Sequence, residues 1–196
     1  MGVVSGELLL LRHGQTEWSE SGRHTGRTDI PLTPEGERLA ARWAPVLRGR
    51  EFRAVLCSPR QRARRTAELA GLRVTAVDGD LAEWDYGAVE GRTTAELRAE
   101  RPGWDIWADG VGVGGETLAH VGDRADLVLA RVAGPLAGGD VMLVAHGHLL
   151  RILAARWLGL EPPAGALLLL DAGTLSVLGH ERERPVLHAW GLQPPE

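Results

Sequence analysis

The chain has 196 residues, 44% of them hydrophobic, which is enough apolar surface to bury the core of one domain. Its formal net charge of -4 argues against a nucleic-acid partner and against binding to an anionic membrane surface. All 22 basic residues are arginine, so Schiff-base chemistry on a lysine is excluded.

No proline-, serine- or charge-rich stretch interrupts the sequence, so residues 1–196 are predicted to form a single domain. The one cysteine, Cys57, excludes an internal disulfide and suits a reducing compartment. The apolar run near the N-terminus has no basic region before it and ends at Arg12, too soon for a signal peptide or a membrane span. These features predict a cytoplasmic location.

Strand-like and helix-like segments alternate along the chain, which predicts an α/β fold. Thr33 before Pro34 marks the start of one helix, and Ser58 before Pro59 marks another. Further helices are expected from Glu116 to Val132, ended by Gly134-Pro135, and from Leu149 to Leu158. The predicted strands are Leu8–Leu11, Ala54–Cys57, Val74–Val77, Val141–Val144, Ala166–Leu170, Thr174–Leu178 and Pro185–Trp190.

The triplet Arg12-His13-Gly14 follows the first predicted strand and is the most informative motif of the chain. A rigid strand would hold the histidine ring in place, and the glycine would let another group approach it closely. The guanidinium of Arg12 is always charged and offers paired donors to phosphate oxygens. The triplet indicates a nucleophilic histidine beside a phosphate, whereas taken alone His13 could only cap the end of the strand.

Three other segments carry polar groups that phosphoryl transfer through a histidine requires. Ser58 to Arg62 follow the second predicted strand, Glu83 to Gly87 lie in a polar stretch, and Ala145 to His148 follow the fourth predicted strand. In an open α/β sheet, ligands bind outside the carboxyl ends of the strands. These groups are therefore expected to converge on one pocket.

The four motifs, in this order, resemble those of the histidine phosphatase superfamily, which includes the cofactor-dependent phosphoglycerate mutases. The segments GQTEWSESGRHTGRTDIPLT, EWDYGAVEG and WDIWADG are most similar to the fungal sedoheptulose-1,7-bisphosphatase branch and to actinobacterial acid phosphatases. The resemblance implies a three-layer α/β/α fold with a mostly parallel central sheet. The matching pieces are Arg12-His13-Gly14 with Thr16, Ser58 with Arg62 and Thr66-Ala67, Glu83 with Gly87 and Glu90-Gly91, and His146-Gly147.

The resemblance also implies a role for each catalytic residue. His13 would attack phosphorus and form a phosphohistidine, without a metal or another cofactor. Arg12, Arg62 and a cationic His146 would hold the phosphate oxygens. Glu83 would protonate the leaving group and later deprotonate water, with Asp85 as the fallback.

The expected substrate-binding residues surround these catalytic positions. His24 stands where the fungal bisphosphatases tend to have tyrosine, which leaves the identity of the substrate open. Arg151 is expected either to meet a second, distal phosphate or to be an ordinary surface residue. Gly115-Glu116-Thr117 resembles a loop of the family whose amides meet phosphate. The full set is Gln15, Ser19, His24, Thr25, Gly26, Ser58, Trp84, Tyr86, Gly147, His148 and Arg151.

The leading function is a metal-independent phosphomonoesterase whose partner is a small phosphorylated metabolite, such as a sugar phosphate or bisphosphate. A phosphoglycerate mutase is an alternative, although the chain has Glu83-Trp-Asp-Tyr-Gly where the mutases carry Glu-Arg-His-Tyr-Gly. A metallohydrolase built on His13, His24, His146 and His148 is another, but their spacing matches no standard ligand set. A non-catalytic phosphate sensor and a homodimer are left open.

Overall fold

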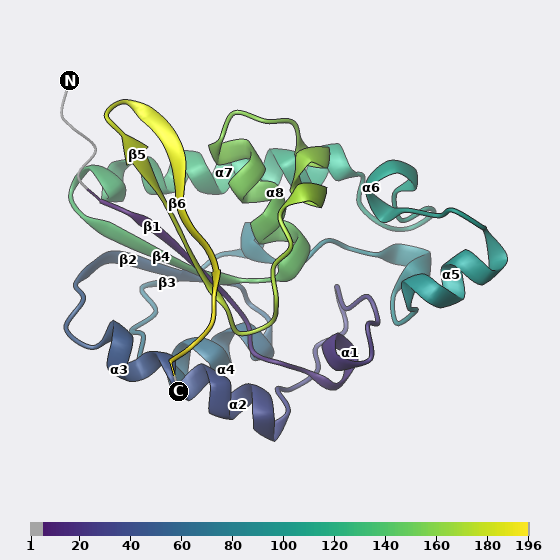
Figure 1. The fold of residues 1–196 in the computed structure, drawn as a ribbon, viewed down its shortest axis with the longest axis horizontal. Helices are drawn as coiled ribbons and strands as arrows, with labels where there is room; N and C mark the ends of the chain where they lie inside the picture. Colours follow the sequence, from purple (N-terminus) through teal and green to yellow (C-terminus); the bar gives the residue numbers. More distant parts are fainter. Residues whose placement is uncertain (1–5, 196) are drawn as a thin grey trace.

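The computed structural model of the protein describes residues 6–195, and its centre is a six-stranded sheet (Figure 1). The strand order is β3-β2-β4-β1-β5-β6. Strands β3, β2, β4 and β1 are parallel, and β5 runs antiparallel to both of its neighbours, β1 and β6. The strands are β1 (Leu8–Arg12), β2 (Phe52–Cys57), β3 (Ala76–Val77), β4 (Asp140–Ala145), β5 (Leu175–Glu181) and β6 (Arg184–Leu192).

Helices cover both faces of the sheet, so the predicted three-layer α/β fold is confirmed (Figure 1). Helices α7 (Leu118–Ala137) and α8 (Gly147–Trp157) lie on one face. The other face carries α2 (Pro34–Ala41), α3 (Trp43–Leu47) and α4 (Gln61–Leu69). The short elements are α1 (Glu17–Glu20), η1 (Gly79–Leu81), η2 (Gly87–Val89), α5 (Thr94–Glu100), α6 (Ile106–Asp109) and η3 (Pro162–Leu167).

The central strand β1 divides the core into two parts. Leu8 and Leu10 pack with residues of α7 and α8, whereas Leu9 and Leu11 pack with residues of α3 and α4. Successive side chains of a strand point to opposite faces, and all four leucines are fully buried. A strand held on both faces gives its last residue, Arg12, and the following His13 a rigid support.

Two predicted helix boundaries differ from the structure. The helix predicted to begin at Ser58-Pro59 is present, but α4 begins only at Gln61, and the Ser58 hydroxyl lies 2.7 Å from Nε2 of His146 instead of capping the helix. Helix α7 continues past Gly134-Pro135 to Ala137. Leu136 is buried in the core, and its packing outweighs the hydrogen bond that proline cannot make. The predicted start at Thr33 is confirmed, since its side chain accepts from Gly36 N.

Two predicted strands are shortened or absent. The run from Val74 to Val77 forms a strand only at its last two residues. The run from Ala166 to Leu170 is not a strand, because η3 extends to Leu167 and the side chains of Leu167 and Leu169 are 83% and 73% exposed. These leucines have no sheet surface to pack on. No helix between residues 6 and 195 combines the length and apolar character that a membrane span requires.

Candidate active site

Three adjacent strand ends bring the motif residues together. Strand β4 lies between β2 and β1. The amide of His13 donates to the carbonyl of Ala145 at 3.0 Å, and the amide of Ser58 donates to that of Val144 at 2.9 Å. The ring centroids of His13 and His146 are 5.1 Å apart. The carboxyl edge of the sheet therefore holds both histidines in one place, as expected for an open α/β sheet.

The ring of His13 is held in one tautomer. Its Nδ1 lies 2.7 Å from the carbonyl oxygen of Gly14, and because a carbonyl oxygen can only accept, Nδ1 carries the proton. Burial lowers the pKa of His13 well below 6.5, and the charges of Arg62 and Arg12 lower it further. The ring is therefore neutral at pH 7, and its Nε2 keeps the lone pair that a nucleophile needs.

Two arginines, the half-buried Arg12 and the fully buried Arg62, lie close to this ring. Arg12 ends β1 and donates to the carbonyl of Leu170. Arg62 lies in the first turn of α4, is fully buried, and donates to the carbonyl of Thr28 at 2.9 Å. The Nε atom of each arginine has no partner within residues 6–195. Buried charged donors without partners are costly, so this pair is suited to an anion that brings its own acceptors.

His146 was expected to be cationic, whereas its surroundings in the structure favour the neutral ring. Burial lowers the pKa of His146 well below 6.5, and Arg62, His13 and Arg12 add to the effect. Its Nε2 lies 2.7 Å from Oγ of Ser58, whereas its buried Nδ1 has no partner in the described part of the chain. The amide of Arg60 donates to Oγ of Ser58 at 3.4 Å, and the hydroxyl can in turn donate its proton to Nε2 of His146. In that tautomer His146 presents Nδ1–H as a neutral donor.

The free energy of unfolding should fall as the pH is lowered through 6.5, because three buried rings resist protonation. Burial also lowers the pKa of His148, after which Arg151 and His24 lower it further. Each ring has its ordinary pKa in the unfolded chain, so stability is full above pH 6.5 and decreases below it by up to about 1.4 kcal/mol per pH unit for each ring. Urea unfolding between pH 8 and 5 in phosphate-free buffer measures this slope.

A matched variant separates the histidine contribution from other acid effects. His148→Asn removes one titrating ring and should reduce the slope by about 1.4 kcal/mol per pH unit. A free energy of unfolding that stays constant from pH 8 to 5 in the unmodified protein would contradict the prediction.

Glu83 is fixed by the start of α8. Its Oε1 accepts from the amides of Trp84 and Leu149, each at 2.9 Å, and its Oε2 accepts from the amide of His148 at 3.1 Å. The side chain is only 8% exposed. Oε1 already has two donors, so Oε2 is the oxygen with room for a proton. The carboxyl group of Glu83 therefore has one defined position, at the wall of a cavity.

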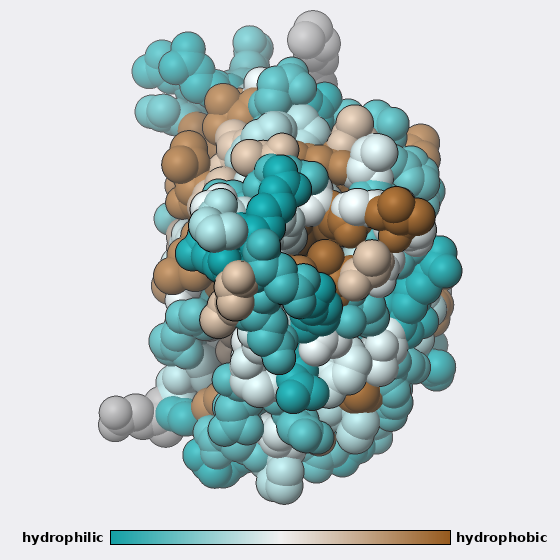
Figure 2. Space-filling model, turned by 90° about the vertical axis from the view of Figure 1, so that its right-hand side faces the viewer, coloured by the Kyte–Doolittle hydropathy of each residue, from teal (hydrophilic) through white to brown (hydrophobic). Residues whose placement is uncertain are grey.

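A cavity of about 590 Å³ opens beside these residues. Figure 2 views the end of the molecule where α5 and α6 lie, and hydrophilic side chains border a hollow in which apolar side chains are visible. Two predicted catalytic residues, Arg62 and His146, are buried beside His13 without lining the cavity. The predicted residues that do line it are Arg12, His13, Ser19, His24, Thr25, Glu83, Tyr86, Gly147, His148 and Arg151.

Four predicted substrate-binding residues lie outside the cavity lining and have structural partners. Gln15 Oε1 accepts from Oγ1 of Thr33 at 2.8 Å, and the amide of Gly26 donates to the carboxylate of Glu90 at 3.0 Å. Trp84 is fully buried in the core. Direct substrate contacts of Gln15, Gly26 and Trp84 are therefore not supported. The fourth is Ser58, which orients His146 as described above.

Sequence reasoning missed the outer half of the cavity. Arg23, Arg98 from α5 and Asp105 before α6 line it, together with Leu169 and Leu170. Arg23, Arg98 and Asp105 lie in stretches without a regular hydrophobic period, and Leu169 and Leu170 lie in a run that was predicted to be a strand, so none was predicted to line the pocket. The available signal was the pair of tryptophans in that stretch, because the rings of Trp104 and Trp107 also line the cavity.

Arg151 lines the cavity from α8 but is partly engaged elsewhere. Its Nε donates to the carbonyl of Gly165 at 3.0 Å, and one terminal nitrogen donates to that of Ala166 at 3.1 Å. Its guanidinium carbon lies 4.6 Å from the centroid of the Trp107 ring. These contacts hold the charge at the cavity wall and leave the other terminal nitrogen without an assigned bond.

Two expectations about the neighbouring loops are not supported. The fallback acid Asp85 forms an ion pair with Arg27 at 2.7 Å and does not line the cavity. The segment Gly115-Glu116-Thr117 does not line it either, and the amide of Glu116 donates to the carbonyl of Asp85 at 3.0 Å. This segment therefore supports the loop that carries Glu83 rather than a phosphate.

The metallohydrolase alternative finds no ligand cluster. Within residues 6–195 no group of three His, Cys, Asp or Glu side chains is placed to hold a metal ion. The four histidines considered form two pairs, with ring centroids 5.1 Å apart for His13 and His146 and 6.3 Å apart for His24 and His148. The first pair faces buried arginines, whose charge disfavours a cation.

Known proteins that resemble this chain identify its family. Residues 8–193 match the model of the histidine phosphatase superfamily (branch 1). The chain belongs to this superfamily. It is 43% identical over 195 residues to an acid phosphatase of Mycobacterium tuberculosis, covering 98% of this chain and 95% of that protein. It is 41% identical over 193 residues to the sedoheptulose 1,7-bisphosphatase of Saccharomyces cerevisiae, covering 82% of this chain and 70% of that protein.

Structural comparison agrees with the sequence comparison. A solved structure from Mycobacterium tuberculosis superposes on this histidine phosphatase with a TM-score of 0.92 and 40% identity, covering 97% of this chain and 99% of the other. The predicted family is therefore confirmed, including its similarity to an acid phosphatase and a sedoheptulose bisphosphatase. These relatives also bear out the predicted class of enzyme, a phosphoric monoester hydrolase.

Proposed function

We propose that this histidine phosphatase hydrolyses a phosphorylated sugar through a covalent phosphohistidine at His13. The observation that carries the proposal is the neutral, buried His13 ring, whose Nδ1 is tied to Gly14 and whose Nε2 has a free lone pair. Arg12, Arg62 and His146 surround it with buried donors that have unused capacity. This is the arrangement that nucleophilic attack on a phosphate dianion requires.

In the first step, Nε2 of His13 attacks phosphorus and forms an N–P bond while the bond from phosphorus to the leaving oxygen breaks. Glu83, protonated on Oε2, gives its proton to that oxygen, so the leaving group departs as an alcohol. Arg12 and Arg62 neutralise the charge that spreads over the three remaining phosphate oxygens. Nδ1–H of His146 donates to the same group.

In the second step, water hydrolyses the phosphohistidine. The carboxylate of Glu83 takes a proton from water as the water oxygen attacks phosphorus. The N–P bond breaks and returns its electron pair to His13. Inorganic phosphate leaves, and Glu83 and His13 are both restored to their starting protonation states.

The outer half of the cavity favours a substrate with a second negative charge. Arg23, Arg98 and Arg151 line this half, against the single carboxylate of Asp105. Trp104 and Trp107 also line the cavity and give it apolar surface of the kind that packs on the C–H groups of a sugar. The yeast relative is named for a sugar bisphosphate, and we propose the same substrate class here.

Arg151→Ala should lower kcat/KM for a sugar bisphosphate by about 10- to 100-fold, the size of one or two charge-assisted hydrogen bonds. The matching monophosphate should be affected little, because the distal phosphate is the group that Arg151 would contact. Arg156→Ala is the matched control, since Arg156 lies on the same helix but pairs with Asp126. Equal losses of kcat/KM on both substrates would show that Arg151 does not contact the distal phosphate.

A substrate screen tests the function itself. The purified protein is assayed for phosphate release from sugar bisphosphates, sugar monophosphates, 3-phosphoglycerate and nucleotides, with and without chelator. Hydrolysis of sugar phosphates that chelator leaves intact and vanadate inhibits is the expected result. Isomerisation of 3-phosphoglycerate without release of phosphate would identify a mutase, and activity restored only by a divalent ion would identify a metal-dependent hydrolase.

We also propose a cytoplasmic location. Cys57 is a free thiol in the interior, and burial raises its pKa to about 12, so it acts as an apolar core residue in a reducing compartment. The homodimer stays a prediction, and sedimentation of the purified protein measures it.

A further inference from the structure

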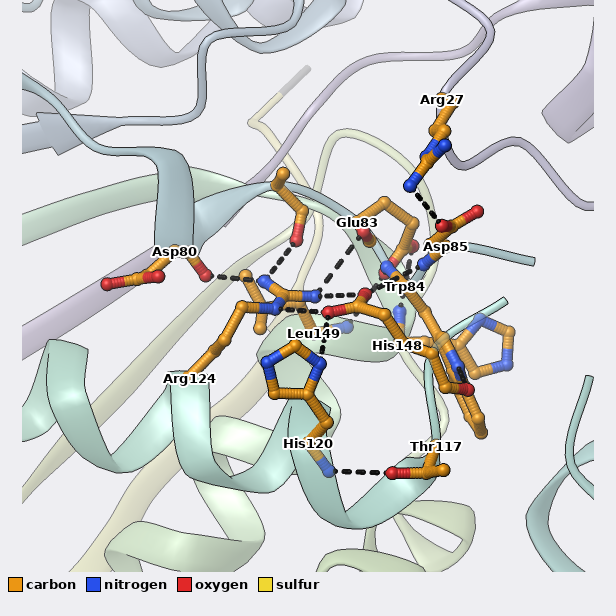
Figure 3. A network of polar contacts seen from close by, with 12 residues as sticks. Arg27, Asp80, Glu83, Trp84, Asp85, Thr117, His120, Arg124, His148 and Leu149 are labelled. Atoms are coloured by element: carbon orange, nitrogen blue, oxygen red, sulfur yellow. Dashed lines mark hydrogen bonds and ion pairs between the residues drawn. The ribbon is translucent and has the colours of Figure 1, made fainter. Parts of the chain in front are cut away.

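Helix α7 carries a buried arginine whose contacts all lie within the segments around Glu83. The side chain of Arg124 is 10% exposed, and it forms a two-point ion pair with Glu116, with both N–O distances at 2.8 Å (Figure 3). Its other bonds go to the carbonyl oxygens of Asp80 at 2.7 Å, Ala82 at 2.9 Å and Glu83 at 3.5 Å. One guanidinium thus serves five acceptors.

Glu116 extends the same support to the residues after Glu83. Its carboxylate accepts from the amide of Asp85 at 2.9 Å, and its carbonyl accepts from Nε1 of Trp84 at 2.9 Å (Figure 3). Its amide donates to the carbonyl of Asp85 at 3.0 Å. The segment from Asp80 to Asp85 is therefore bound along one side by two charged residues of α7 and the loop before it.

This segment needs such support because it has little regular structure. After η1 ends at Leu81, residues 82–86 belong to no helix or strand. The carbonyls of Ala82 and Glu83 lack ladder partners and are satisfied by Arg124 instead. On the opposite side, the carboxyl group of Glu83 meets the amides of His148 and Leu149 at the start of α8.

We propose that the ion pair of Arg124 and Glu116 positions Glu83 for proton transfer to the leaving group. The proposal rests on the proposed role of Glu83 as the general acid. Neither Arg124 nor Glu116 lines the cavity, and their side chains bind each other and the main chain of residues 80–85, so both act through Glu83 as positioning residues. A buried ion pair is a weak source of stability compared with apolar packing. The three carbonyl oxygens that Arg124 binds, with the amide of Asp85 bound by Glu116, instead fix the main chain that carries the acid.

The test compares two substrates that differ in their need for an acid. The leaving group of an alkyl phosphate is an alkoxide, which needs the proton from the acid. The leaving group of p-nitrophenyl phosphate is a stable phenolate, which does not. Arg124→Lys keeps the charge but cannot reach all the acceptors at once. We expect it to lower kcat for the alkyl phosphate by about 10²-fold, the cost of a displacement near 1 Å, and to change kcat for p-nitrophenyl phosphate little.

A double-mutant cycle separates positioning from general stability. In a Glu83→Gln background, Arg124→Lys should cost nothing further on the alkyl phosphate, because the group that it positions is already absent. Glu116→Gln keeps the shape of the side chain, and we expect it to lose activity on the alkyl phosphate but not on p-nitrophenyl phosphate. It replaces Arg124→Lys in the comparison if that variant folds poorly. Arg156→Gln breaks an ion pair between α8 and α7 away from this segment and should affect neither substrate.

Three outcomes would overturn the proposal. Wild-type activity of both variants on the alkyl phosphate is one, and an equal loss on both substrates is another. A loss that adds in full to that of Glu83→Gln is the third. If the single variant Glu83→Gln loses activity only on the alkyl phosphate, the proposed function stands in each of these cases. If it loses activity equally on both substrates, the acid role of Glu83 is excluded as well.

Discussion

Replacing His13 by alanine should lower kcat for phosphate release by on the order of 10⁶-fold, the size of loss that follows removal of a nucleophile from an enzyme that forms a covalent intermediate. The neutral ring supplies the lone pair at Nε2, and no neighbour can take its place. His146 is also neutral, but its Nε2 faces the Ser58 hydroxyl at 2.7 Å. The measurement is steady-state kcat on a sugar phosphate and on p-nitrophenyl phosphate, and both should be lost.

Rapid quenching at neutral pH tests the covalent intermediate directly. The unmodified protein should carry one added phosphoryl group on the peptide that contains His13, and His13→Ala should carry none. His188→Ala is a matched control, because that histidine pairs with Glu7 and lies outside the cavity lining. Near wild-type turnover in His13→Ala, or a phosphoryl group that persists in it, would exclude the proposed nucleophile.

The inner half of the site could be predicted because it depends on the strands. Runs of four or more apolar residues marked the buried strands β1, β2 and β4, and the polar residue after each run had to lie at the same sheet edge. This placed His13, Ser58 and His146 together before any distance was known. Their hydrogen bonds to neighbouring strands now explain why the placement is rigid.

The protonation of His146 could not be predicted from the sequence. From the sequence alone, a histidine placed beside two arginines can equally be a cation or a neutral donor. The choice depends on burial first and on the summed charges of Arg62, His13 and Arg12, which only the folded chain brings together. The partners of Arg124 were hidden for a similar reason, since the carbonyls that it binds belong to the short η1 and to the irregular residues after it.

The outer half of the cavity escaped prediction because short helices leave weak patterns. Helices α5 and α6 have seven and four residues, too few for a hydrophobic period to appear. Arg98 contributes to the cavity while its Nε donates to the carbonyl of Trp104 at 2.9 Å. The substrate selectivity that we propose therefore depends on the part of the chain whose sequence carries the least structural information.

Glu83→Gln should lower kcat/KM for a sugar phosphate by about 10²- to 10⁴-fold, the range usual for a positioned proton donor. Glutamine keeps an oxygen that can accept from the amides of Trp84 and Leu149, and only the amide of His148 loses its acceptor, so two of the three bonds still hold the side chain. What it loses is the proton that Oε2 gives to the leaving oxygen.

The same variant should hydrolyse p-nitrophenyl phosphate at a rate within about tenfold of the unmodified protein, because a phenolate leaves without a proton. The difference between the two substrates is the decisive quantity. A residue that only held the fold or the phosphate would affect both alike, since each substrate presents the same phosphoryl group to Arg12, Arg62 and His146. Equal losses would assign Glu83 to binding or structure and would require another source for the proton.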